Sequence, residues 1–259
     1  MPESLAILQP EWDLPPTIRA AVTTRVGGVS VQGFASLNLA GHVGDVAAHV
    51  TENRRRLQKT LSLPAQPLWL NQVHGVAVAK VGYDLEGATA DAAVSTLPGL
   101  AAAVLTADCL PVLFYGQRAT GTPVVAAAHA GWRGLAAGIL EQTLNKMACP
   151  PARVSCWLGP AIGPAEFQVG AEVKARFVAE QPEAEQAFVA DTEAGGSKYL
   201  ANLYQLARLR LRRAGVSEVA GGDFCTVSDQ RFFSYRQSGR DPAGVPVPCG
   251  RFASLIWID

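Results

Sequence analysis

Three nearly continuous apolar runs in the middle of the chain constrain its fold most strongly. They cover residues 100–105, 110–115 and 124–128. Strands that face water on one side alternate polar and apolar residues, whereas runs this continuous are typical of strands covered on both faces. We therefore expect a central β-structure that is covered on each side by other parts of the chain.

Shorter β-type and helix-like segments surround this centre. Strands are expected at residues 18–24, 68–70, 76–81, 92–96, 154–158 and 254–257, and helices at residues 45–61, 135–147, 171–179 and 198–214. Asp45 is a plausible N-cap of the first helix, and Gly215 is the expected C-cap of the last. The segments do not follow a regular βαβ alternation, and the polar segment 181–196 is too short for an interdomain linker. We expect one α+β domain over residues 1–259, with mixed β-sheets packed against helices.

Composition excludes several classes of partner. Lysine plus arginine and aspartate plus glutamate both number 22, so there is no electrostatic case for binding nucleic acid or an anionic membrane. The longest apolar tract, residues 100–114, is interrupted by Thr106 and Asp108, and no stretch has the length of a membrane span. Residues 1–16 lack the pattern of a signal peptide. Five scattered cysteines, an odd number, predict reduced thiols in a cytoplasmic protein.

Two histidines and a cysteine stand where apolar runs give way to turns. His74 precedes Gly75 at the expected end of a strand, and a surface turn histidine fits this position equally well. Cys109 follows Asp108 inside an apolar tract, where a charge is costly unless it is paired. His129 ends an apolar run and precedes a glycine-rich turn, where a backbone approaches another group closely. An inert buried cysteine and a satisfied core histidine are the alternatives.

The three residues allow two kinds of chemistry. A cysteine and two histidines would leave a fourth position open on a zinc ion, which is the pattern of a catalytic site. The same side chains could form a nucleophilic cysteine with a histidine base. Their spacing is too long for a compact zinc knuckle, so the residues alone do not decide between these readings.

Other polar residues next to glycine or in turns are candidates for substrate binding. Arg25 and Arg236 could clamp a phosphate or carboxylate through their planar forks, or could form surface ion pairs. Asn38 and His42 flank a glycine turn and could orient a ligand, and Gln72 lies two residues before His74. The loop 159–164 is interpreted as a cavity wall without a chemical role.

Taken in order, these segments resemble the YfiH or laccase-domain family of purine nucleoside phosphorylases, formerly called multicopper polyphenol oxidases. The matching motifs span residues 23–257 and lie at 24–30, 36–39, 42–45, 72–75, 106–111, 129–134, 158–164 and 232–236. One departure follows Arg236, where Gln237 and a longer segment, residues 239–249, precede Gly250. We expect this longer loop to border the cavity.

The resemblance implies a YfiH-like cysteine-hydrolase fold with a zinc ion held by His74, Cys109 and His129. It implies phosphorolysis of adenosine, inosine, guanosine and 5′-methylthioadenosine, with adenosine deamination as a second activity, in a monomer or weak homodimer. Asp108 would be a proton shuttle or would support the ligands, and Arg25 or Arg236 would neutralise phosphate. The resemblance also keeps open a metal-independent cysteine amidase that edits peptidoglycan precursors. A multicopper oxidase needs many more histidines than the four present, so copper is the poorer alternative.

Overall fold

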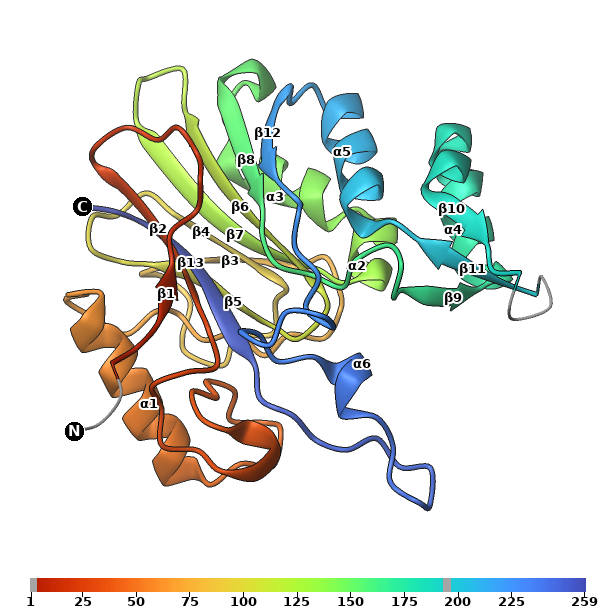
Figure 1. Cartoon of the computed structure of the whole chain (residues 1–259). Helices are drawn as coiled ribbons and strands as arrows, with labels where there is room; N and C mark the ends of the chain where they lie inside the picture. Colours follow the sequence, from red (N-terminus) through yellow and green to blue (C-terminus); the bar gives the residue numbers. More distant parts are fainter. Residues whose placement is uncertain (1–3, 193–196) are drawn as a thin grey trace.

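The computed structural model describes residues 4–192 and 197–259, and in this part of the chain the strands form three β-sheets (Figure 1). Residues 1–3 and the end of the polar segment 181–196 lie outside the described residues. The six-stranded sheet has the order β12-β8-β6-β7-β4-β3. Its strands are β3 (Val78–Lys80), β4 (Ala92–Ser95), β6 (Leu110–Gln117), β7 (Pro123–Ala130), β8 (Val154–Leu158) and β12 (Glu218–Gly221). The pairs β8–β6, β6–β7 and β7–β4 are antiparallel, and the two edge pairs are parallel.

The four-stranded sheet joins both ends of the chain to its middle. Its strands, in spatial order, are β1 (Ile7–Leu8), β2 (Ile18–Thr23), β13 (Phe252–Ile258) and β5 (Ala102–Thr106), all antiparallel. In this way the last strand of the chain lies between the second strand and the fifth (Figure 1).

Alternate side chains of the central strands face different cores. On β6, Leu113 belongs to the core between the two larger sheets, whereas Val112 and Phe114 face the helices. On β13, Phe252 lies between the sheets, and Leu255 faces the opposite way, towards α1 (Ala47–Thr60). The result is four layers in the order helix, sheet, sheet, helix. The expectation that the apolar runs are covered on both faces is confirmed.

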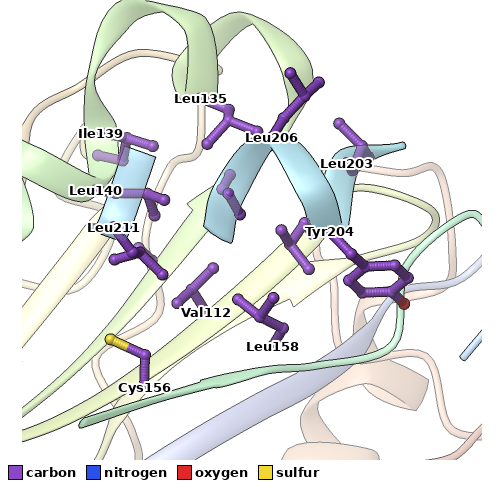
Figure 2. Packing of buried hydrophobic residues seen from close by; sticks show 14 of the residues in the cluster. Val112, Leu135, Ile139, Leu140, Cys156, Leu158, Leu203, Tyr204, Leu206 and Leu211 are labelled. Atoms are coloured by element: carbon purple, nitrogen blue, oxygen red, sulfur yellow. The ribbon is translucent and has the colours of Figure 1, made fainter. Parts of the chain in front are cut away.

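Helices α2 (Trp132–Ala137), α3 (Ile139–Met147) and α5 (Leu203–Arg213) cover the outer face of the six-stranded sheet. Figure 2 shows Val112 and Leu158 of the sheet close to Leu211 of α5 and Leu140 of α3. Burying a leucine or valine side chain of this kind stabilises the fold by about 1.5–3 kcal/mol.

A small outlying sheet corrects one helix boundary. The expected helix 198–214 begins later, because residues Lys198–Ala201 form β11, which pairs with β9 (Gln168–Gly170) and β10 (Phe188–Ala190). Helix α5 starts after Asn202, whose side chain accepts a hydrogen bond from the backbone N–H of Gln205. Asn202 is therefore the N-cap. The C-cap of α5 is Ala214 rather than Gly215. Gly215 follows it with a φ of +89°. The helix α4 (Ala171–Glu180) and the short 3-10 helix Pro182–Ala187 complete this region.

Three further expectations were wrong. Asp45 does not cap α1, because its Oδ2 accepts hydrogen bonds from Ser30 and Asn38 instead. The helix expected at 135–147 is interrupted at Gly138, whose φ of +101° ends α2 and starts α3. Residues 68–70 are buried but form no strand.

Several short elements were not expected from the sequence. They are β1, β9, β10, β12, α6 (Tyr235–Ser238) and the 3-10 helices Gln32–Phe34, Pro151–Arg153 and Pro182–Ala187. Within the described residues, no helix combines the length and the apolar character that crossing a membrane requires.

Candidate metal centre and its cavity

The fold brings His74, Cys109 and His129 to one place. One ligand atom from each of them lies within 4.8 Å of the other two. Cys109 follows β5 in the turn before β6, and the antiparallel register of β6 and β7 places Pro111 opposite His129. The Cys109 Sγ atom is 3.7 Å from His74 Nε2, and the two imidazole rings are 4.7 Å apart with their planes at 74°. His129 is buried, whereas His74 is exposed and Cys109 is partly exposed.

A buried carboxylate, Asp91, orients both histidines. Its Oδ1 accepts a hydrogen bond from Nδ1 of His129 at 2.8 Å and another from the backbone N–H of His74 at 2.8 Å. Its Oδ2 accepts from the N–H groups of Gly75 at 2.6 Å and Val73 at 3.2 Å. With Nδ1–H donated to Asp91, loss of the other ring proton leaves the lone pair of His129 on Nε2, towards the centre.

Asp91 was missed in the sequence. The signal that could have found it is an acidic residue at the start of the apolar segment Ala90–Val94, the same signal that singled out Asp108. Burial raises the pKa of the Asp91 carboxyl, but the hydrogen bonds from His129 and the backbone outweigh it, so its pKa is lowered overall.

Two non-glycine residues of the site have left-handed backbone conformations. His74 has a φ of +61° and Asp108 a φ of +87°. Such conformations cost about 1–3 kcal/mol each and persist where surrounding contacts impose them. At His74 the contact is the N–H bond to Asp91. At Asp108 the carboxylate accepts hydrogen bonds from the Thr226 hydroxyl and from the backbone N–H of Arg236, both at 2.6 Å.

Glycines leave room for the three side chains. A Cβ placed on Gly131 would lie 2.9 Å from Cys109 Sγ, 2.9 Å from His74 Cδ2 and 3.4 Å from His129 Nε2. A Cβ on Gly134 would lie 2.9 Å from the carbonyl oxygen of Gly75. The close backbone approach expected for the glycine-rich turn is confirmed.

The charged forms of Cys109 and His129 stabilise each other. Burial raises the pKa of the Cys109 thiol, but the charge of His129 and hydrogen bonds from both histidines outweigh burial and lower this pKa to about 6. Burial lowers the pKa of His129, but the Cys109 thiolate and Asp91 raise it to about 9. A thiolate is the form of cysteine that binds metals. The donor set of one thiolate and two imidazole nitrogens, in a cradle kept open by Gly131, fits a zinc ion with a fourth position for water or substrate.

The centre lies in a cavity of about 370 Å³. Beside the three cluster residues, its lining includes His42, Gln72, Leu105, Thr106, Ala107, Tyr235 and Arg251. His42 and Gln72 were expected near the site. The amide of Gln72 exchanges two hydrogen bonds of 2.8 Å with the backbone of Leu105, so this side chain is part of the wall.

Three other candidates are engaged elsewhere and do not line this cavity. Arg25 donates from Nε to the carbonyl oxygen of Ala35, and its guanidinium lies over the ring of Phe233. Asn38 is fully buried and bonds the backbone of Ala40 and Arg251. Arg236 donates to the carbonyl oxygens of Glu166 and Gln168, both at 3.2 Å.

Two loops were expected to border a cavity, and both lie at cavities other than the one that holds the cluster. Gly163 and Pro164 line a separate cavity of about 630 Å³. The long loop after Arg236 folds back on itself through a bridge between Arg240 and Pro246. It borders a small cavity of about 200 Å³, and only the flanking residues Tyr235 and Arg251 reach the metal cavity. Both of these flanking residues were missed in the sequence.

Comparison with known proteins shows which family the chain belongs to. A family described as multi-copper polyphenol oxidoreductase laccase matches residues 19–259. A purine nucleoside phosphorylase of Pseudomonas aeruginosa is 50% identical over 254 residues, which cover 98% of each chain. The purine nucleoside phosphorylase YfiH of Escherichia coli is 48% identical, covering 97% of this chain and 98% of that protein.

Solved structures agree in fold as well as in sequence. A Neisseria meningitidis protein of family DUF152 has a TM-score of 0.88 and 45% identity, covering 98% of this chain and 99% of that one. The protein YlmD of Geobacillus stearothermophilus has a TM-score of 0.82 and 30% identity, covering 94% and 92%. With sequence and structural matches over nearly its whole length, the chain belongs to the YfiH family of laccase-like proteins.

Proposed function

We propose that this chain is a zinc-dependent purine nucleoside phosphorylase acting on adenosine, inosine, guanosine and 5′-methylthioadenosine, with adenosine deamination as a second activity. The observation that carries the proposal is the convergence of His74, Cys109 and His129 in a cavity of about 370 Å³. This volume lies in the usual range for small-molecule sites. The relatives named as purine nucleoside phosphorylases support the substrate class.

The reaction needs little covalent chemistry from the protein. In phosphorolysis an oxygen of hydrogen phosphate forms a bond to C1′ of the ribose, and the C1′–N9 bond breaks. The electron pair of that bond goes to the purine, and the proton of hydrogen phosphate ends on the free base. In deamination, water replaces the amino group at C6 and ammonia leaves. A bound zinc ion would supply Lewis-acid chemistry for a substrate oxygen or water.

Other residues of the chain would position the side chains that bind the metal. Asp91 fixes the ring of His129 and the backbone of His74, so the donor atoms are oriented before any ligand arrives. Gly131 keeps the cradle open. Neither Arg25 nor Arg236 lines the cavity, so the earlier assignment of phosphate neutralisation to them has no support from the geometry.

An oxidase with several copper ions is a poor match to the cluster. The chain contains four histidines, and two of them form the cluster with one cysteine. This set can hold a single ion, whereas an oxidase with several copper ions needs many more imidazole ligands.

The test is metal content by mass spectrometry together with product analysis from adenosine with and without phosphate. We expect about one zinc per chain, with adenine and ribose 1-phosphate formed only when phosphate is present. Inosine formed without phosphate would show the deamination. The proposal fails if Cys109→Ala retains full activity towards both adenosine and inosine.

A second candidate is a metal-independent cysteine amidase that edits peptidoglycan precursors. It is favoured by the row Asp91, His129 and Cys109, in which the carboxylate bonds Nδ1 of the histidine next to the thiol. Such a row is the arrangement of a nucleophile, a base and an orienting acid. An enzyme inactivated by thiol alkylation but indifferent to chelators, and inactive on nucleosides, would favour this candidate.

A further inference from the structure

Arg251 is the arginine that lines the metal cavity. It follows Gly250 and precedes β13, and its backbone N–H donates to the buried amide oxygen of Asn38 at 3.0 Å. Its Nη1 donates to the carbonyl oxygens of Cys249 at 2.7 Å and Gly250 at 3.1 Å. Both backbone and guanidinium are therefore held in place on one side.

The charge of Arg251 has no carboxylate partner among the described residues. Arg54, whose charge also acts on His42, is paired with Glu86 at 2.9 Å. The pKa of His42 is lowered by burial first, then by the charges of Arg251 and Arg54. Both arginine charges therefore act in the direction of a positive potential on the His42 side of the cavity.

The guanidinium of Arg251 is also placed by an aromatic ring. Its Cζ atom lies 6.0 Å from the ring centre of Tyr235, which lines the same cavity and is 45% exposed. Within the described chain, this guanidinium donates hydrogen bonds from Nη1 alone, so Nε and Nη2 retain N–H donors. The Nη1 side of the guanidinium is held by the backbone, and the edge formed by Nε and Nη2 can donate two hydrogen bonds to two oxygens of a phosphate.

We propose that Arg251 binds the inorganic phosphate that attacks the nucleoside, with Asn38 and Tyr235 as the residues that position it. The inference rests on the proposed function, because it assigns the co-substrate of that same cavity. Arg25 and Arg236 do not compete for this role, since one lies over Phe233 and the other bonds carbonyl oxygens outside the cavity.

The test is titration calorimetry of the zinc-loaded protein with inorganic phosphate, paired with steady-state phosphorolysis of adenosine. Arg251→Gln removes the charge, and Arg251→Lys keeps the charge but removes the fork. We expect both variants to weaken phosphate binding and to raise KM for phosphate, by about tenfold or more for Arg251→Gln, because hydrogen bonds to charged groups are lost. The rate of deamination, which uses no phosphate, should fall much less than the rate of phosphorolysis in the same variant.

Arg240→Gln is the matched control. This arginine donates to the carbonyl oxygen of Gly244 in the exposed loop and does not line the metal cavity. Metal content and circular dichroism of every variant show that the site and fold are retained. If Arg251→Gln does not fold, the phosphate affinity of Arg251→Lys tests the assignment instead.

The outcomes separate this inference from the proposed function. Phosphate binding that is weakened at Arg251 but not at Arg240 supports the assignment, even if no nucleoside is consumed, in which case the proposed function alone fails. Equal phosphate binding by wild type and both Arg251 variants overturns the assignment while phosphorolysis stands. A wild-type protein that binds no phosphate also overturns it.

Discussion

The three residues of the cluster leave no room for a side chain on Gly131. Gly131 has a φ of −57°, which any residue adopts, so the need for glycine there is steric rather than conformational. The Cβ of an alanine would meet Cys109 Sγ and His74 Cδ2, both at 2.9 Å. Such short contacts would push the Cys109 and His74 side chains apart, and they would not strain the backbone of residue 131.

We therefore expect Gly131→Ala to lose zinc while the fold remains. Metal affinity should fall by about tenfold or more, because displaced ligands no longer share one ion. Competition with a chromogenic chelator measures the affinity, and circular dichroism reports the fold. Gly41→Ala is the control, since a Cβ there meets nothing within 4 Å and Gly41 does not have a positive φ. Normal zinc binding by Gly131→Ala would contradict the steric argument.

Asp91 is the other residue on which the cluster depends. Its two oxygens accept four hydrogen bonds, from His129 Nδ1 and from the backbone of Val73, His74 and Gly75. In Asp91→Asn the amide NH2 group would face N–H groups, and it cannot accept hydrogen bonds from them. A buried donor without an acceptor costs about 1–3 kcal/mol.

For Asp91→Asn we expect the free energy of unfolding to fall by about 2 kcal/mol or more and zinc affinity to fall by about 10–100-fold. Urea denaturation and metal competition measure the two quantities. Asp84→Asn is matched to it, because the Asp84 carboxylate also accepts a backbone N–H, from Lys80, but at an exposed site. Similar losses in both variants would show that Asp91 has no special relation to the centre.

At the level of elements, the turn between β5 and β6 is fastened to the C-terminal part of the chain. Asp108 in this turn accepts hydrogen bonds from Thr226 and from the backbone N–H of Arg236, which follows Tyr235 in α6. Both oxygens of Asp108 are thus occupied by structural partners. This arrangement favours a role in positioning Tyr235 beside the cluster over the role of a proton shuttle.

The two roles of Asp108 predict different results for Thr226→Val, which removes the buried hydroxyl and keeps the side-chain shape. If Asp108 positions the segment, Thr226→Val and Asp108→Asn should both lower kcat/KM by about tenfold with an unchanged pH profile, since one hydrogen bond to a charged group is lost in each. If Asp108 transfers a proton, only Asp108→Asn should lose activity, and one limb of its pH profile should disappear. Initial rates across pH decide between them.

The sequence could predict elements wherever the residues themselves are decisive. The strands β6 and β7 follow from the uninterrupted apolar runs 110–115 and 124–128. Lys198–Ala201 was misread as helix because its strand pairing with β9 and β10 is a contact between distant segments. Asp91 was missed for the same reason, since its importance comes from the backbone of residues 73–75. The cluster itself was specified by resemblance to a family and not by spacing.

At the level of the whole molecule, the four layers explain why the cavity residues come from distant parts of the chain. Strand β13 joins β2 to β5, which brings Arg251 beside the turn that holds Cys109. Continuous apolar runs predict that strands are covered, but not by which layer. That choice depends on the pairing of the last strand with the second and fifth.

The loop after α6 lies outside this layered body (Figure 1). Arg240 bridges Pro246, and the Val245 side chain is 57% exposed. The backbone N–H of Asp241 donates to the carbonyl oxygen of Val245, and the backbone N–H of Val245 donates to Oδ1 of Asp241. At the base of the loop, the N–H of Val247 donates to the carbonyl oxygen of Gly239 at 3.1 Å. This last hydrogen bond is the closing pair that a two-residue hairpin turn requires.

We expect that replacing residues 240–246 by Asn-Gly leaves the layered body and the metal centre intact. The free energy of unfolding should change by no more than about 0.5 kcal/mol, because the removed contacts lie within the loop and on its surface. Zinc content should be unchanged, and KM for adenosine should stay within about twofold. Urea denaturation, metal analysis and steady-state kinetics measure these quantities. A large rise in KM with normal zinc content would show that the loop closes over the cavity when substrate binds, and loss of zinc would show that Arg251 and Tyr235 depend on the loop for their position.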